Sequence, residues 1–449
     1  MIEYLAENQL IHPSHQAYRK HHNTTTALIQ LYDVWLESLE NGELAGVCFL
    51  DMSAAFDIVD HSLLLRKMEL YGFDNSMLMW TGSYLSDRTQ TVCIDGSLSK
   101  LMPVMHGVPQ GSILGPLLYT IFTNELPEAI HSHVQHDPEP LGETSWPAFS
   151  MGCKCFGTVA CYADDTTYSC SDSDPSRLSQ KLSSQYQVLS DFLVSNKLKL
   201  NDDKTHLMVM STSQARLSRG KKNEPKVKIT TPTEVIEQSE SEKLLGAWLH
   251  EDMKWAEYIM NSSESLVRSL GSRVGALKKV SQVASFRNRK LIANGIFMSK
   301  LLYLIPLWGG SAKYLIRVLQ VLQNKAARAM TKLDWFTPTS ELLKQCGWVS
   351  VNQLSIYHSV VQVFKVLQDK SPKYLHSMLT TPYGYKTREA DSGKIRHRRG
   401  PELEISQDSF RWRSADFFNS LPAHIRKSDS LKMFKQAAKD WIKENIDLN

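Results

Sequence analysis

Apolar residues recur with two different spacings along the first half of the chain. Spacing of three or four residues predicts helices over residues 26–39, 63–70, 77–85, 114–124 and 174–194. Short apolar and β-prone runs predict strands, most clearly over residues 45–50 and 159–163. Asn41-Gly42 and Gly72 are helix stop signals, and Asp174-Pro175 is a start signal. The mixture predicts an α/β domain.

The second half of the chain is predicted to be helical. Helical spacing of apolar residues continues over residues 266–277, 315–329 and 409–441. The most apolar stretch, residues 292–308, contains Lys300 and Pro306, so we expect a buried helix and not a membrane span.

Two short hairpins and one long loop are also predicted. Residues 86–96 alternate in polarity and reach an Asp95-Gly96 turn, and residues 243–249 form a strand interrupted by glycine. Residues 211–232 are rich in Ser, Lys and Pro, which predicts an exposed loop.

The acidic pair Asp164-Asp165 interrupts the apolar run of residues 159–168. Two adjacent carboxylates at the end of a strand are unfavourable unless a cation binds them. We expect a tight hairpin in which Asp164 faces one side of the sheet and Asp165 lies near the tip. Asp51 ends the apolar strand 45–50, before a turn into a helix, and could complete a site for Mg²⁺.

Composition adds a charge asymmetry to this picture. With 42% hydrophobic and 22% charged residues among 449, the chain has an ordinary globular composition. Its seven cysteines follow no regular framework, which suggests a reducing compartment, and the first residues contain no secretory leader. Residues 1–255 carry a net charge of −12 and residues 256–449 a net charge of +16. The basic half is suited to a polyanion, although a solvated helical surface is the alternative.

Three segments together resemble motifs A, B and C of reverse transcriptases from LINE-type (non-LTR) retrotransposons. They are Asp51-Met52-Ser53-Ala54-Ala55-Phe56-Asp57, Gly107-Val108-Pro109-Gln110-Gly111-Ser112 and Tyr162-Ala163-Asp164-Asp165. One segment alone would be weak evidence for the resemblance, but three segments in this order are specific evidence. The resemblance implies a right-hand polymerase with an α/β palm and remnant fingers, followed by a mostly helical thumb and a C-terminal tail.

The resemblance also implies an activity and a set of site residues. The activity is RNA-directed DNA synthesis, in which two Mg²⁺ ions, or Mn²⁺, are held by Asp51, Asp164 and Asp165. The residues implied to contact the nucleotide or template are Phe56, Gln110, Gly111 and Tyr162. Phe56 would be the steric gate against the ribose 2′-hydroxyl, and its alternative is a helix residue facing the core. Asp57 and Asp60 fit a helix start and a partner for His61 or Arg66 better than extra metal ligands.

Weaker resemblances lie outside these three motifs. Residues 196–209 resemble motif D, in which Lys204 could approach the leaving pyrophosphate; a surface lysine beside Asp202 and Asp203 is the alternative. Residues 243–249 resemble motif E, with Leu245 and Gly246 in a primer grip. Residues 15–28 resemble the segment before the palm, and because only fourteen residues precede it, the fingers are expected to be truncated.

These resemblances imply a domain division and partners. Residues 1–45 would be remnant fingers, residues 46–255 the palm, residues 256–345 the thumb and residues 346–449 a basic helical tail. The partners would be an RNA template, a DNA primer or target and dNTPs, without a membrane. The expected location is the nucleus and cytoplasm. The basic residues 394–399 are the one candidate import signal.

Two rival functions are open at this point. A catalytically inactive protein derived from such an element would bind nucleic acid without polymerising it. A two-metal nuclease or integrase would use similar acids but gives no reason for the turn at residues 107–111. Nucleotide incorporation and cleavage without dNTPs separate these alternatives.

Overall fold

The computed structural model describes residues 1–132, 158–212, 226–231, 234–379, 393–395 and 403–447. The chain forms two compact units. Unit 1 comprises residues 1–20 and 43–239, and unit 2 comprises residues 21–42 and 240–449. The predicted division into fingers, palm, thumb and tail stays a prediction.

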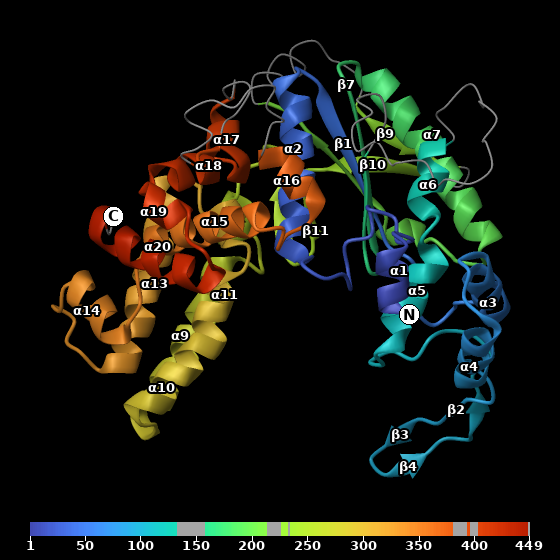
Figure 1. The fold of residues 1–449 in the computed structure, drawn as a ribbon, viewed down its shortest axis with the longest axis horizontal. Coiled ribbons are helices and arrows are strands. Elements are labelled where there is room, and N and C mark those ends of the chain that lie inside the picture. Colours follow the sequence, from blue (N-terminus) through green and yellow to red (C-terminus); the bar gives the residue numbers. More distant parts are fainter. Residues whose placement is uncertain (133–157, 213–225, 232–233, 380–392, 396–402, 448–449) are drawn as a thin grey trace. The chain divides into compact units, whose positions relative to one another are not determined.

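Unit 1 is built around a six-stranded sheet with the strand order β6-β7-β1-β8-β10-β9 (Figure 1). Its strands are β1 (Leu44–Leu50), β6 (Thr158–Tyr162), β7 (Asp165–Asp172), β8 (His206–Met210), β9 (Lys228–Thr230) and β10 (Val235–Ser239). β1 is antiparallel to both β7 and β8, whereas β10 runs parallel to β8. β9 lies inside the segment predicted to be a loop, which is a correction; residues 213–225 of that segment lie outside the described residues.

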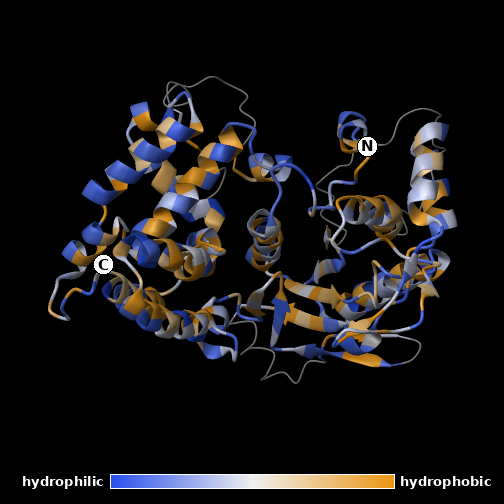
Figure 2. Ribbon diagram, turned by 90° about the horizontal axis from the view of Figure 1, so that it is seen from below, coloured by the Kyte–Doolittle hydropathy of each residue, from blue (hydrophilic) through white to orange (hydrophobic). Residues whose placement is uncertain are grey.

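The central position of β1 follows from its sequence. All seven of its residues are buried, as expected of an uninterrupted apolar run between two other strands. Gly46 lets helix α7 (Pro175–Ser195) approach closely, because a Cβ there would lie 2.7 Å from a methyl group of Leu182. Figure 2 shows apolar residues concentrated on the strands of this unit.

The helices of unit 1 match most of the predicted segments. They are α1 (Ile2–Glu7), α3 (His61–Leu70), α4 (Asn75–Leu85), α5 (Leu114–Thr123), α6 (Leu126–Ser132) and α7, with a short 3₁₀ helix (Asp202–Lys204). Asp174 caps α7 as predicted, accepting hydrogen bonds from the backbone N–H groups of Ser176 and Arg177.

A predicted hairpin extends from α4. Its strands are β2 (Thr89–Gln90), β3 (Cys93–Ile94), β4 (Ser97–Leu98) and β5 (Met102–Pro103). Asp95 and Gly96 both have positive φ at the β3–β4 turn, which confirms the turn expected from the Asp-Gly pair.

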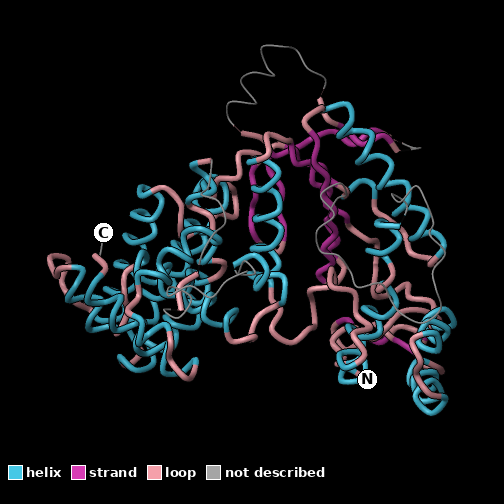
Figure 3. The backbone as a smooth tube through the Cα atoms, turned by 45° about the horizontal axis from the view of Figure 1, so that its top comes forward, coloured by secondary structure: helices cyan, strands magenta, loops and turns pink. Residues whose placement is uncertain are grey.

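Unit 2 is mainly helical (Figure 3). Its longer helices are α2 (Thr24–Glu40), α9 (Leu266–Val283), α10 (Phe286–Ile292), α13 (Lys313–Thr331), α14 (Thr339–Cys346), α15 (Val351–Leu367), α16 (Lys373–Leu379), α18 (Phe410–Ser420) and α20 (Leu431–Asn445). The shorter ones are α11 (Ser299–Leu302), α12 (Ile305–Trp308), α17 (Glu404–Gln407) and α19 (Ala423–Arg426), with π-helical turns at Glu257–Asn261 and Ala293–Met298.

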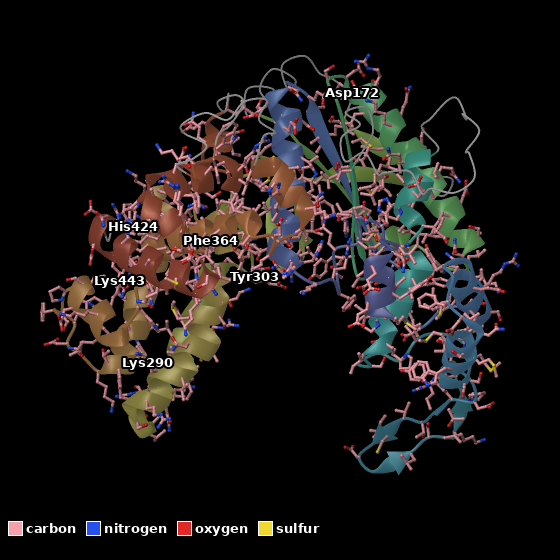
Figure 4. The ribbon with its side chains drawn as sticks, in the orientation of Figure 1. Asp172, Lys290, Tyr303, Phe364, His424 and Lys443 are labelled. Carbon is pink, nitrogen blue, oxygen red and sulfur yellow. The ribbon has the colours of Figure 1, made fainter. Side chains whose placement is uncertain are left out.

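The core of unit 2 joins helices that are far apart in the sequence. Phe364 of α15, labelled in Figure 4, stacks on Phe434 of α20 with ring centroids 4.0 Å apart. Both rings are almost fully buried. The predicted hairpin is present as β11 (Ser241–Leu244) and β12 (Ala247–His250).

The single helix predicted over residues 292–308 is wrong. Most of its apolar side chains are buried, but the segment breaks into a π-helical turn, α11 and α12, with Leu304 at φ 57°. Pro306 explains the break, because proline cannot donate the backbone hydrogen bond that a continuous helix requires. Within the described part of the chain, every helix is too short or too polar to span a membrane.

Candidate active site

The first acidic residue of the site, Asp51, leaves the sheet directly after β1. Its backbone carbonyl accepts a hydrogen bond of 2.9 Å from the N–H of Asn201, and the Asn201 side chain donates to the Asp51 carboxylate at 3.4 Å. Lys204 Nζ lies 3.6 Å from the same carboxylate oxygen. The segment that leads into β8, residues 201–204, therefore orients Asp51 while leaving its side chain partly exposed.

The acidic pair lies at the hairpin between β6 and β7. Tyr162 pairs with Asp165, so Ala163 and Asp164 form the two-residue turn, with Ala163 at φ 60°. The expectation that Asp165 lies near the tip is wrong: Asp164 occupies the tip, and Asp165 begins β7. The left-handed conformation of Ala163 closes the turn one residue earlier than expected.

Strand register brings the three carboxylates to one edge of the sheet. Leu50 pairs with Thr166 in the antiparallel β1–β7 ladder, so the next step sets Asp51 opposite Asp165. The pKa of Asp165 is raised, first by partial desolvation and then by the charges of Asp164 and Asp51. The three acids therefore interact electrostatically, and a cation would relieve their repulsion.

The acids do not form a complete metal site by themselves. Among the residues that the structure describes, no three acidic, histidine or cysteine side chains gather closely enough to hold a metal ion. Mg²⁺ commonly takes one or two protein carboxylates and completes its octahedron with water and substrate phosphates. The donor set at this edge fits that mode of binding.

Residues 52–60 form turns and not the expected start of a helix. Helix α3 begins at His61, and Asp60 caps it by accepting a hydrogen bond from the N–H of Leu63. Asp60 also pairs with Lys197 at 2.6 Å, so the predicted partners His61 and Arg66 are wrong. The hydrogen bond from Lys197 and then that from the N–H of Leu63 lower the pKa of Asp60.

Phe56 lies in this turn with its ring stacked on Tyr119 of α5. The ring centroids are 4.4 Å apart and the planes are inclined by 30°. Tyr119 is buried and its hydroxyl donates to the sulfur of Met52 at 3.4 Å. Burial, reinforced by Cys161 and Asp164, raises the pKa of Tyr119, which keeps the hydroxyl protonated. Tyr119 thus fixes the ring that the sequence identified as the candidate gate.

The turn at residues 107–111 is held against residues 56–61. The N–H of Val108 donates to the carbonyl of Phe56 and that of Gly107 to the carbonyl of Val59, each at 2.8 Å. His61 Nε2 lies 2.7 Å from the Gly107 carbonyl oxygen. Gly107 has φ +88°, and a Cβ there would lie 2.6 Å from the backbone oxygen of Asp57. The main chain at Gly107 is therefore packed too closely against Asp57 to admit a side chain.

The side chain of Gln110 is oriented by Asp57, for which the sequence did not predict this role. Its side-chain nitrogen donates to a carboxylate oxygen of Asp57 at 2.9 Å. Gly111 follows with φ +77° and open space around its Cβ position. The roles of Tyr119, Asp57 and His61 depend on contacts between segments about fifty residues apart, which no local pattern encodes.

The remaining predicted site residues lie in two places. Lys204 ends the 3₁₀ helix of unit 1 beside Asp51, and its side chain is largely exposed. Leu245 and Gly246 form the β11–β12 turn of unit 2, both with positive φ, and the Tyr303 hydroxyl donates to the Leu245 carbonyl. The basic strip over residues 394–399 is described only at Lys394 and Ile395.

Comparison with known proteins gives an independent assignment. Residues 1–249 match the family model described as reverse transcriptase (RNA-dependent DNA polymerase). The RNA-directed DNA polymerase from mobile element jockey of Drosophila melanogaster is 26% identical over 326 residues, covering 72% of this chain and 32% of that protein. The probable RNA-directed DNA polymerase from transposon BS of the same species is 25% identical over 354 residues, covering 77% and 36%. The chain thus spans about a third of the length of these relatives.

Solved structures give only a distant likeness. Apo telomerase from Candida tropicalis aligns over 79% of this chain and 52% of its own, with 12% sequence identity and a TM-score of 0.40. At these values the likeness does not by itself establish a shared fold.

Proposed function

Because the chain belongs to the reverse transcriptase (RNA-dependent DNA polymerase) family, we propose that it adds deoxynucleotides to a primer 3′-hydroxyl along an RNA template and releases pyrophosphate. Its similarity to polymerases of mobile elements supports an origin in a LINE-type retrotransposon. The partners would be an RNA template, a DNA primer or target and dNTPs. In this proposal the six-stranded sheet is the palm, residues 256–345 are the thumb and residues 346–449 are the tail.

The observation that carries the proposal is the position of three carboxylates at one edge of the sheet. Asp51 and Asp165 end or begin neighbouring strands, and Asp164 lies in the adjoining turn. Desolvation and then the charges of Asp164 and Asp51 raise the pKa of Asp165, and acids that destabilise one another in this way favour the binding of divalent cations. A structural ion-pair network would instead match each acid with a basic side chain. Within the described part of the chain, Asp51 has such a neighbour, Lys204, whereas no ion pair is found at Asp164 or Asp165.

We assign the bound cations to Asp51, Asp164 and Asp165. Two Mg²⁺ ions, or Mn²⁺, would activate the 3′-hydroxyl and neutralise charge on the triphosphate. The protein's own contribution is then positioning. Asn201 and the strand register hold the carboxylates, and Lys204 supplies a cation near Asp51 for the developing negative charge of the leaving group.

We propose that Phe56 and Gln110 shape the nucleotide pocket. The ring of Phe56 stacks on Tyr119, so it resists displacement by a ribose 2′-hydroxyl. Asp57 holds the amide of Gln110, and the glycine turn lets main chain approach a base pair. Tyr162 would flank this pocket from β6, and the β11–β12 turn with Leu245 and Gly246 would contact the primer end.

The test is primer extension on an RNA template with Mg²⁺ and dNTPs. The purified chain is compared with a double variant, Asp164→Ala with Asp165→Ala, and RNA binding is measured for both proteins in parallel. Template-directed extension by the chain and none by the variant, with equal binding, is the expected result. Binding without extension by either protein would replace this proposal with a nucleic-acid-binding function.

A further inference from the structure

One segment of unit 2 carries positive charge without any negative charge. Between Ser265 and Leu333 the sequence contains thirteen Lys and Arg residues and no Asp or Glu. This segment forms α9, α10 and α13, which pack against one another. Lys290 of α10 is labelled in Figure 4. A segment with this many cations and no acid of its own is suited to a polyanion.

Helix α13 divides sharply into a buried and an exposed face. Leu315, Leu319, Ala326 and Met330 are buried. The exposed positions recur three or four residues apart, so they form one stripe along the helix. We call this stripe the basic face of α13: Tyr314, Arg317, Val321 and Lys325, which are exposed, and the half-buried Arg328 at its end. It is about 21 Å long at 1.5 Å per residue.

Two adjacent aromatic side chains are exposed where the basic face ends. Lys332 ends α13 in the left-handed conformation with φ 62°, and the chain then presents Trp335, 65% exposed, and Phe336, 88% exposed. The Arg328 guanidinium lies over the Trp335 ring, 4.8 Å from its centroid, and donates to the backbone carbonyls of Trp335 at 3.0 Å and Thr337 at 3.4 Å. Arg328 therefore fixes the loop while both rings face solvent.

Exposed aromatic residues of unit 2 coincide with this charged segment. Among the described residues of the unit, the exposed aromatic side chains are Phe286, Tyr314, Trp335 and Phe336. All four lie within the acid-free segment or just after it. Interleaved cations and exposed aromatic rings are the pattern of proteins that bind single-stranded nucleic acid, where cations follow the backbone and rings stack on bases.

We propose that Trp335 and Phe336 form a stacking site for unpaired bases of a single-stranded nucleic acid whose phosphates lie along the basic face of α13. Stacking requires an accessible base face, and base pairing in a duplex hides it, so the site selects single strands. An apolar protein partner would pack against the two rings, but the adjacent row of cations would contribute nothing to its binding. The inference rests on the proposed function only in that a template supplies the single strand.

The experiment measures binding of a fluorescently labelled single-stranded oligoribonucleotide of ~12 nucleotides, within the range of known site sizes. The full chain is titrated at low and at moderate salt, with a duplex of the same sequence in parallel. Trp335→Ala and Phe336→Ala should each weaken single-strand binding roughly fivefold to a hundredfold. Duplex affinity and the salt dependence should stay nearly unchanged.

Substitutions at the same position distinguish stacking from apolar docking. Trp335→Phe should retain most of the affinity, whereas Trp335→Leu, which is apolar but not planar, should behave like Trp335→Ala. Lys325→Gln should reduce the salt dependence of both single-strand and duplex binding, by about one unit of slope at most. Trp80→Ala is the matched control, because Trp80 is an exposed tryptophan in unit 1.

Three results would overturn the inference. They are unchanged single-strand affinity in Trp335→Ala and Phe336→Ala, full affinity in Trp335→Leu, and an equal loss of duplex affinity. None of these measurements needs nucleotide incorporation. A chain that polymerises but shows one of these results refutes the stacking site alone, and a chain that binds as predicted without extending a primer refutes the proposed function alone.

Discussion

At the scale of single residues, the candidate site depends on how two turns are fastened together. The turn after β1 carries Phe56, and the turn before α5 carries Gln110. Backbone hydrogen bonds from Gly107 and Val108, together with the Asp57–Gln110 contact, hold the two turns in contact. A change in one turn is therefore expected to displace residues of the other.

Alanine substitutions at Gly107 and Gly111 distinguish the cost of a steric clash with backbone atoms from the cost of backbone strain. Both glycines have positive φ, but only at Gly107 would a Cβ meet backbone atoms. Gly107→Ala should lower the free energy of unfolding by on the order of 3 kcal/mol and abolish incorporation. Gly111→Ala should cost about 1–2 kcal/mol. Urea unfolding measures both, and equal costs would contradict this account of Gly107.

Phe56 should control the choice of sugar. Phe56→Ala is expected to lower the preference for dNTPs over rNTPs, expressed as a ratio of kcat/KM values, roughly tenfold to a hundredfold. The variant Tyr119→Phe keeps the stacked ring, so it should retain the preference. An unchanged ratio in Phe56→Ala would show that this ring faces the core and not the nucleotide.

The motif residues could be identified from the sequence, but the residues that hold them in position could not. Asp51, Asp164 and Asp165 stand out because acids at strand ends are unusual in apolar surroundings. In the sequence, Tyr119 resembles any core residue of an amphipathic helix. Its role comes from stacking on Phe56, which is distant in the sequence. The position of Asp165 was predicted wrongly because it depends on the left-handed conformation of Ala163. A glycine at this position would have indicated that conformation in the sequence, whereas alanine does not.

At the scale of secondary-structure elements, capping and periodicity were reliable predictors. The start of α7 was predicted from Asp174, whose side chain accepts hydrogen bonds from the first turn. Asn23 caps α2 in the same way, but this role was not predicted. The break at Leu304 was missed because apolar spacing alone does not register the effect of Pro306. Strand β9 was missed because polar neighbours hide its three residues within a loop-like segment.

Packing of α2 against α18 should make stability depend on pH. Arg411 of α18 donates to the carboxylate of Asp33 at 3.4 Å and by its charge lowers the pKa of that acid. Burial, with smaller contributions from Glu37 and Glu40, outweighs this effect and raises the pKa of Asp33 to about 7. An acid with a raised pKa in the folded state contributes stability that is complete below its unfolded pKa and is lost as the pH rises to about 7.

Asp33→Asn should therefore gain stability relative to the unaltered chain as the pH rises from about 5 to about 8. The gain should be on the order of 2 kcal/mol, measured by urea unfolding at both pH values. Asp416→Asn, an exposed position on α18, serves as the control and should show no such trend. A relative loss of stability at the higher pH would mean that the ion pair with Arg411 outweighs burial.

At the scale of the whole molecule, the sequence predicted the classes of structure but not how the chain divides. An α/β first half and a helical second half were expected, and both are present. Helix α2 precedes β1 in the sequence yet belongs to unit 2, where Tyr32 stacks on Trp255 with ring centroids 5.3 Å apart. Such pairing across more than two hundred residues cannot be inferred from local spacing.

The charge asymmetry of the chain fits the division of labour that we propose. The half of the sequence with excess acid contains the carboxylates of the site, and the half with excess base contains the acid-free helices of unit 2. An acidic site recruits cations and basic helices recruit phosphates, so the two halves would act on different parts of one nucleic-acid substrate.

The most direct test of the central claim compares chemistry with stability in a single variant, Asp165→Asn. Incorporation of one dNTP opposite an RNA template is measured over a range of Mg²⁺ concentrations, alongside thermal unfolding. We predict a loss of incorporation of roughly 10²–10³-fold or more, with an unfolding temperature that is unchanged or higher, because the amide removes the repulsion from Asp164 and Asp51. Retained incorporation, or a loss of activity explained by unfolding, would contradict the assignment of these carboxylates to catalysis.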